Sequence, residues 1–215
     1  MEFRELQWNG PNFVIGLTGG IGSGKSVVGE MFQDLGARLL NADLVAREVL
    51  FSAELRPKLT SEFGEEILGS DGEISREALA RIVFTDEAKR LRLNDLIHPG
   101  VRGRFHETIQ SLTPGQIMVY DVPLLFEAGL EKDFDLVLVV SASRDVRLAR
   151  VKERNGWSEE EFNGRDGAQI PLTEKEKRAD LVINNSAGLD ALRNTVGDIY
   201  AHVLKARNED QEQQS

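Results

Sequence analysis

A glycine-rich segment near the start of the chain carries residue types that bind phosphate groups. It reads Thr18-Gly19-Gly20-Ile21-Gly22-Ser23-Gly24-Lys25-Ser26. A glycine, four further residues and then Gly-Lys-Ser form the pattern of a phosphate-binding loop. Glycines let the backbone curl so that successive N–H groups point at an anion, and serine offers a hydroxyl to Mg²⁺. The segment therefore predicts a nucleotide site, with Lys25 on the outer phosphates and Ser26 on the metal.

The residues on either side predict the strand and the helix that such a loop needs. Residues 13–17 form a short apolar run, as a buried strand does. After the loop, apolar residues recur at helical spacing until Gly36, which favours the end of a helix. This order favours nucleotide binding over the alternative, a glycine-rich turn beside a surface lysine.

Composition restricts the class of protein. The chain has 215 residues, 40% hydrophobic and 29% charged, which suffices for one core plus a small appendage. A net charge of −10 argues against general binding to nucleic acid or membrane surfaces, and the lack of cysteine excludes disulfides and thiolate metal sites. We see neither a membrane span nor a signal peptide, so we expect a cytoplasmic protein with no obligate protein partner.

Beyond the loop, strands continue to alternate with helices. Apolar runs predict further strands at 37–40, 116–121, 134–140 and 181–183. Such alternation predicts a parallel sheet with helices on both faces and a ligand site at the carboxyl ends of its strands. Residues 51–112 instead repeat apolar residues at helical spacing, which predicts a helical insertion that His98-Pro99-Gly100 interrupts. Residues 155–178 are charged and contain glycine, as a mobile flap does.

Several residues could act beside the loop. Asp43 follows the second strand and either accepts the proton of an attacking hydroxyl or is a plain helix N-cap. Asp121 ends the next strand and either holds Mg²⁺ or only terminates that strand. Arg147, Arg150 and Arg154 share one helix face, which suits phosphate and purine contacts. The alternative for these arginines is a solvated face paired with neighbouring carboxylates.

Further segments, in order and spacing, resemble dephospho-CoA kinase over roughly residues 13–205. They are residues 17–26, Asn41-Ala42-Asp43-Leu44-Val45-Ala46-Arg47, Ile97-His98-Pro99, Asp121-Val122-Pro123-Leu124-Leu125-Phe126-Glu127 and Ala179-Asp180-Leu181-Val182-Ile183-Asn184-Asn185. The loop alone is shared by many kinases, whereas the set is specific. The resemblance implies an α/β protein of the P-loop kinase fold, with a parallel five-stranded sheet flanked by helices, a helical substrate-binding insertion and a lid. It also implies Mg²⁺-assisted, ATP-dependent phosphorylation of the ribose 3′-hydroxyl of dephospho-CoA, the last step of coenzyme A synthesis.

The resemblance also implies roles for individual residues. Asp43 is the carboxylate that activates the 3′-hydroxyl, and Lys25 acts with it in catalysis. Residues expected near the acceptor are Thr18, Arg47 and His98. Those expected to bind ATP are Gly20, Ile21, Gly22, Ser23, Gly24, Lys25, Ser26, Arg150 and Lys175, and those expected at Mg²⁺ are Ser26 and Asp121. Where the family usually has Asp-Ala-Asp, this chain begins with Asn41, so one carboxylate of the motif is lost.

The same resemblance divides the chain into parts. We expect a nucleotide-binding core at 12–50 and 113–205, a lid at 155–178 within it, a CoA-binding insertion at 51–112, and flexible ends at 1–11 and 206–215. The main alternative is another small-molecule kinase of this fold, for a nucleoside, a nucleoside monophosphate or a sugar acid. The insertion and His98-Pro99 argue against it. A GTP switch is disfavoured because no Asn-Lys-x-Asp segment follows a strand, and an inactive nucleotide-binding relative is the third alternative.

Overall fold

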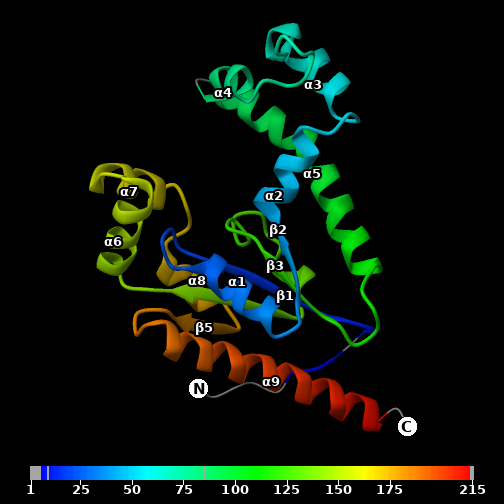
Figure 1. The fold of residues 1–215 in the computed structure, drawn as a ribbon, viewed down its shortest axis with the longest axis vertical. Helices are drawn as coiled ribbons and strands as arrows, with labels where there is room; N and C mark the ends of the chain where they lie inside the picture. The colour runs from blue at the N-terminus through cyan, green and yellow to red at the C-terminus, as the bar shows by residue number, and fades with distance from the viewer. Residues whose placement is uncertain (1–5, 9, 85, 214–215) are drawn as a thin grey trace. The chain divides into compact units, whose positions relative to one another are not determined.

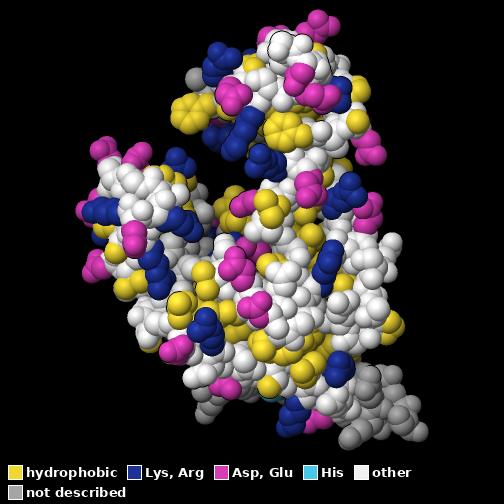
Figure 2. Space-filling view, viewed as in Figure 1, with side chains coloured by type: hydrophobic (Ala, Val, Ile, Leu, Met, Phe, Trp, Pro, Cys, Tyr) yellow, Lys and Arg dark blue, Asp and Glu magenta, His cyan; other side chains and the backbone are white. Residues whose placement is uncertain are grey.

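The computed structural model describes residues 6–8, 10–84 and 86–213 (Figure 1). Its contacts divide the chain into two compact units. The first unit runs to Leu40 and resumes at Leu112, and the second comprises Asn41–Ser111. Figure 2 shows side chains of both charge signs, with scattered apolar ones, over the viewed face. No helix in the described ranges is both long and apolar enough to cross a membrane.

The first unit is built on the parallel five-stranded sheet predicted from the sequence. Its strands lie in the order β2-β3-β1-β4-β5. They are β1 (Phe13–Gly19), β2 (Arg38–Asn41), β3 (Ile117–Asp121), β4 (Leu136–Ser141) and β5 (Leu181–Asn184). The central strand β1 pairs in parallel with β3 and with β4, and it is buried along its whole length. A strand covered on both faces needs apolar residues at every position, which explains the unbroken apolar runs in the sequence.

The helices of the first unit pack against the sheet or against one another. They are α1 (Lys25–Asp34), α6 (Arg144–Asn155), α7 (Glu159–Asp166), α8 (Leu172–Arg178) and α9 (Leu189–Gln213). The largest apolar cluster joins β1, β3 and β4 to α1 and α9, and it includes Phe13, Phe32 and Val196. This cluster fixes the carboxyl end of β1, where the glycine loop begins.

Parts of the two ends that the sequence predicts to be flexible are packed or helical in the structure. At the start, Leu6 and Trp8 belong to the main apolar cluster, and the Trp8 ring lies 5.2 Å from that of Phe13. At the other end, α9 continues to Gln213 because Ala206 extends its buried face. Residues 1–5 and 214–215 lie outside the described residues.

The flap predicted at 155–178 is helical. It contains α7 and α8. Helix α7 begins with a capping box: Ser158 Oγ accepts a hydrogen bond from the Glu161 N–H at 3.1 Å, and the Glu161 carboxylate accepts one from the Ser158 N–H at 2.8 Å. The movement of this segment stays a prediction.

The second unit is helical, as the sequence predicts. It contains α2 (Ala42–Leu50), α3 (Arg56–Phe63), α4 (Arg76–Phe84) and α5 (Glu87–Gln110), with a 3-10 turn at Glu65–Ile67. Another 3-10 turn, Glu131–Asp133, belongs to the first unit. The predicted interruption at 98–100 is wrong, because α5 runs through Pro99. Proline removes one helical hydrogen bond, and α5 compensates by burying Leu93 and Phe105 against its neighbours. Gly100 lets α2 approach, since a Cβ there would lie 2.5 Å from Val49. This packing brings α2 into the second unit, which begins at residue 41 rather than 51.

Candidate active site

The glycine loop joins β1 to α1 in a conformation that needs glycine. Gly22 and Gly24 have φ values of 76° and 90°, in the left-handed region that side chains with a Cβ rarely adopt. The Ser23 N–H donates to the Gly20 carbonyl at 3.1 Å and closes the turn. Helix α1 begins directly afterwards, and its N-cap, Gly24, supplies no side chain to bond its first N–H groups. A helix start of this kind presents unpaired N–H groups and a positive dipole end to an anion.

Lys25 and Asp121 lie together, as the parallel sheet predicts. Their side chains form an ion pair, with Lys25 in the first turn of α1 and Asp121 at the end of β3. Asp121 pairs with Leu17 in the sheet register, so its carboxylate emerges beside the loop. Both side chains are largely buried, with 14% and 2% exposed. The carboxylate therefore does more than terminate its strand, because it holds the lysine of the loop.

The arginine face of α6 separates into buried and exposed members. Arg150 donates to the carbonyl oxygens of Ser23 at 3.2 Å and Gly22 at 3.5 Å. Arg147 is buried and also reaches the loop, through the Ile21 carbonyl. Arg154 is exposed, and its Nε donates to the side-chain oxygen of Asn155. The alternative of a solvated face paired with neighbouring carboxylates is therefore wrong for Arg147 and Arg150, whereas Arg154 lies on a solvated part of the face.

Lys175 is a fully buried ammonium surrounded by oxygens. Its Nζ lies 2.9 Å from the Glu127 carboxylate, and it donates to the Pro123 carbonyl at 3.2 Å and the Gln169 side chain at 3.1 Å. Thr18 donates to the same Pro123 carbonyl at 3.1 Å. Lys175 thus joins α8 to the segment that follows β3, and its ammonium is engaged with the protein itself.

In the second unit, Asn41 rather than Asp43 caps α2. The Asn41 side-chain oxygen accepts a hydrogen bond from the Leu44 N–H at 3.0 Å. The alternative that Asp43 is the N-cap is therefore wrong, and its carboxylate is exposed in the first turn. Arg47 follows four residues later and is exposed on the same face. His98 is exposed on α5.

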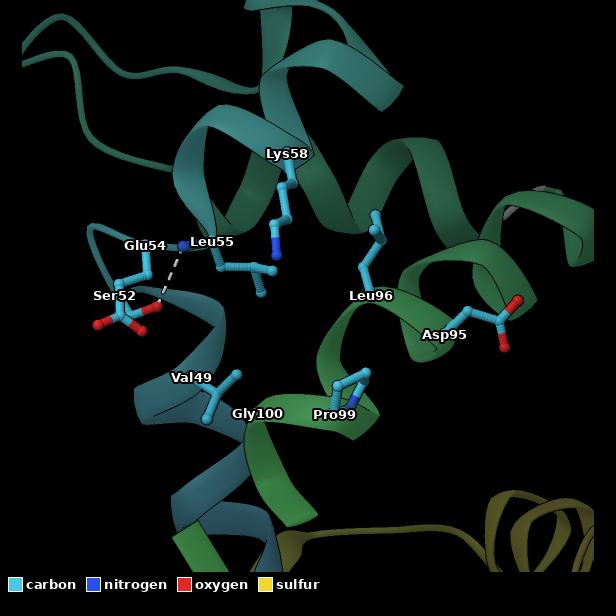
Figure 3. A pocket seen from close by; sticks show the side chains of 9 residues that line it. All are labelled: Val49, Ser52, Glu54, Leu55, Lys58, Asp95, Leu96, Pro99 and Gly100. Carbon is cyan, nitrogen blue, oxygen red and sulfur yellow. Dashed lines mark hydrogen bonds between the residues drawn. The ribbon is translucent and has the colours of Figure 1, made fainter. Parts of the chain in front are cut away.

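A hollow of about 180 Å³ lies between α2, α3 and α5 of this unit (Figure 3). Val49, Leu55 and Pro99 give it an apolar lining, and Lys58 extends its side chain toward the space in the view of Figure 3. A second hollow along α5 is lined by Asp95, His98, Pro99, Arg102, Gly103 and His106. The unit therefore offers apolar surface beside charged groups of both signs.

Comparison with known proteins decides the family. The family model for dephospho-CoA kinase matches residues 13–191. The chain is 46% identical to the dephospho-CoA kinase of Bacillus cereus over 175 residues, 80% of this chain and 88% of the relative. It is 40% identical to that of Syntrophotalea carbinolica over 196 residues, 89% of this chain and 92% of the relative. This chain belongs to the dephospho-CoA kinase family.

Solved structures agree with the family and with the fold. A crystal structure from Thermus thermophilus matches with a TM-score of 0.78 at 35% identity, covering 89% of this chain and 98% of that one. The dephospho-CoA kinase of Campylobacter jejuni matches with a TM-score of 0.69 at 26% identity, covering 91% and 99%. The resemblance drawn from the sequence is thus confirmed, and the chain is a kinase of the P-loop fold.

Some contacts at the loop of this chain are not predicted from its sequence. Asn185 is buried, and its side-chain N–H₂ donates to the Ser23 carbonyl at 2.8 Å. Its position directly after β5, at the carboxyl edge of the sheet, is the signal that could have found it. Asp166, which pairs with Arg147, lies 19 residues along the chain and carries no spacing signal.

Proposed function

We propose that this chain transfers the γ-phosphoryl group of ATP to the ribose 3′-hydroxyl of dephospho-CoA, forming coenzyme A and ADP. The observation that carries the proposal is a complete phosphate loop, with its lysine already held at the site, in a chain of this family. Catalysis of phosphoryl transfer consists mainly of positioning and charge stabilisation, and both are supplied by the loop and its helix.

Lys25 is proposed to exchange Asp121 for phosphate oxygens when ATP binds. The ion pair keeps the ammonium at the carboxyl edge of the sheet before the nucleotide arrives. Charge grows on the phosphate oxygens as the bond to the γ-phosphorus breaks, so a preorganised cation acts mainly on the transition state. Thr18, at the end of β1, is proposed to contact the acceptor.

The donor set at the loop fits Mg²⁺ brought in with the nucleotide. Ser26 has an exposed hydroxyl in the first turn of α1, and Asp121 contributes carboxylate oxygens. Within the described residues, no group of three or more acidic or histidine side chains could hold a metal independently. Mg²⁺ typically takes few protein ligands together with substrate phosphates, and when bound it neutralises their charge.

Asp43 is proposed to accept the proton of the 3′-hydroxyl and to fix its direction of attack. Its carboxylate is exposed, and the capping of α2 is done by Asn41. Arg47 and His98 are proposed to bind the acceptor, in a unit that supplies both apolar and charged surface. Residues 155–178 are proposed to close over ATP, because water would otherwise compete with the ribose hydroxyl.

The function is tested by ADP formation with ATP and each of four acceptors: dephospho-CoA, a nucleoside, a nucleoside monophosphate and a sugar acid. We expect ADP to form with dephospho-CoA alone. Preferential use of another acceptor would establish the alternative kinase, and ATP binding without turnover would indicate an inactive relative.

The role of Asp43 is tested by single-turnover transfer at saturating ATP. We expect Asp43→Asn to lose about 10²–10⁴-fold in rate, the usual worth of a positioned acid–base group, with ATP binding unchanged. Glu48→Gln is the matched control, because it neutralises another exposed carboxylate of α2. If Asp43→Asn transfers phosphate at the rate of the control, the proposed base is wrong and Asp121 becomes the next carboxylate to test.

A further inference from the structure

Arg147 connects the glycine loop to helix α7. Its side chain is 6% exposed, and Nη1 donates to the Ile21 carbonyl of the loop at 3.1 Å. The same guanidinium forms a bidentate pair with Asp166, the last residue of α7, at 2.6 and 3.0 Å. Bidentate charge-assisted hydrogen bonds are strong and directional, so they fix the plane of the guanidinium.

The side chain of Ile21 contacts both α6 and α7. It packs against the apolar cluster of Leu148 and Val151 from α6 with Phe162 from α7. The Arg147 guanidinium lies 5.2 Å from the centre of the Phe162 ring. Ile21 is therefore attached to α6 by a hydrogen bond through its backbone, and to both α6 and α7 by apolar contacts through its side chain.

Glycines let α6 approach the loop at contact distance. A Cβ on Gly22 would lie 2.6 Å from the Arg147 carbonyl oxygen, and one on Gly20 would lie 3.0 Å from Nη1. The two glycines thus serve the packing of α6 as well as the curvature of the loop. Such close packing leaves little room for the loop to move relative to α6.

The hydrogen bond to the Ile21 carbonyl sets the direction of the next backbone donor. A trans peptide is planar, so the Ile21 C=O and the Gly22 N–H point in opposite directions. Since Arg147 draws the carbonyl toward itself, the Gly22 N–H is turned to the opposite side of the peptide. Phosphate loops bind their ligand through backbone N–H groups of this kind.

We propose that Arg147 is a positioning residue for ATP, which orients the Gly22 N–H through the Ile21 carbonyl and is itself oriented by Asp166. The proposal rests on the proposed function in that it takes ATP as the ligand of the loop. It makes the geometry of the loop depend on the docking of α7, a helix of the segment expected to act as the lid.

The test measures ATP affinity by calorimetry without acceptor, and KM values for both substrates. We expect Arg147→Met to weaken ATP binding roughly tenfold or more, the scale of one lost charge-assisted hydrogen bond, with the KM for dephospho-CoA changed less than twofold. The ATP affinity of Arg147→Lys should fall between that of the parent and that of Arg147→Met, because an ammonium keeps the charge but lacks the planar fork. Amide exchange at residues 20–24 of the ATP-free protein should be faster in Arg147→Met.

Arg144→Met is the matched control. Arg144 also joins α6 to α7, through Glu159 at 2.7 Å and Asn163 at 2.8 Å, and its side chain is 47% exposed. If this variant weakens ATP binding as much as Arg147→Met, the contact is merely structural and the proposal is overturned. Equal loss of affinity for dephospho-CoA would overturn it as well.

Asp166→Asn provides a second variant if Arg147→Met does not fold, because the amide keeps the size of the carboxylate and one oxygen acceptor for Arg147. It should weaken ATP binding in the same direction, and add nothing when Arg147 is already replaced. Parental ATP affinity in Asp166→Asn refutes the proposal. A parent that binds ATP but does not phosphorylate dephospho-CoA refutes the proposed function alone, and a parent that binds no ATP refutes both.

Discussion

Replacing Lys175 with methionine removes a fully buried ammonium but keeps a long apolar stem. The change leaves the Glu127 carboxylate without the cation that lies 2.9 Å away, and it removes one donor each from the Pro123 carbonyl, which keeps Thr18, and the Gln169 side chain. Removing one partner of a buried ion pair usually costs about 3–5 kcal/mol of unfolding free energy. Glu127 also accepts a hydrogen bond from the Ile170 N–H and is 21% exposed, so water can partly replace the ammonium. We therefore expect the lower end of the range, about 3 kcal/mol.

Thermal unfolding measures this loss. A chain of this size loses about 2–4 °C in Tm per kcal/mol, so Lys175→Met should unfold about 6–12 °C below the parent. Lys177→Met is the matched control on the same helix, since its ammonium is 71% exposed and pairs with Glu174 three residues away. Exposed pairs of this kind contribute about 0.5 kcal/mol or less, so the control should stay within about 2 °C of the parent.

The same two variants separate stability from nucleotide binding. If Lys175→Met unfolds at the temperature of Lys177→Met, the reasoning about the buried charge is refuted. A raised KM for ATP in that stable variant would instead assign the ammonium to the nucleotide, as the resemblance to the family first implied.

Further predictions concern catalysis, capping, pH and substrate binding. Lys25→Ala should cost roughly 10²-fold or more in turnover at saturating substrates, and parental turnover would refute the placing of the γ-phosphate. Asn41→Asp should keep parental Tm and turnover, because aspartate caps a helix as well as asparagine; a large loss of Tm would contradict this. Burial raises the pKa of Asp135 above the ordinary value of 3.8, so the folded state holds this proton more tightly than the unfolded state. The unfolding free energy of the parent should therefore fall, relative to that of Asp135→Asn, as pH rises from about 4. Denaturant titrations measure both free energies, and a difference between the two proteins that does not change with pH would disprove this prediction. Dephospho-CoA should slow amide exchange within residues 51–112, and protection confined to 155–178 would overturn the assignment of the insertion.

The sequence predicts the sheet and the loop because short local patterns of residue types specify both. Unbroken apolar runs specify strands buried on both faces, and the glycine pattern specifies the loop between β1 and α1. The proximity of Lys25 to Asp121 follows from the parallel arrangement alone, since both residues lie at the carboxyl ends of the sheet strands.

Features that depend on distant partners could not be predicted in this way. The partners of Arg147 and Lys175 come from elements far along the chain, so spacing on one helix could not distinguish buried ion pairs from solvated ones. The sequence predicts that Pro99 ends a helix, but the packing of α5 against other helices outweighs one missing hydrogen bond. Leu6 lies in an end that the sequence predicts to be flexible, because the core that buries it is assembled from later segments.

The central position of β1 has a consequence for biosynthesis. Its sheet neighbours, β3 and β4, are encoded roughly 100 residues later, beyond the whole Asn41–Ser111 unit. At about 5–20 residues per second, this apolar strand leaves the ribosome several seconds before either neighbour exists. All residues of the helical unit between them are synthesised before β3, so we expect this unit to fold first, whereas the sheet must wait for long-range closure. During that interval β1, which carries the glycine loop, has neither of its sheet neighbours and is open to aggregation and to chaperone binding.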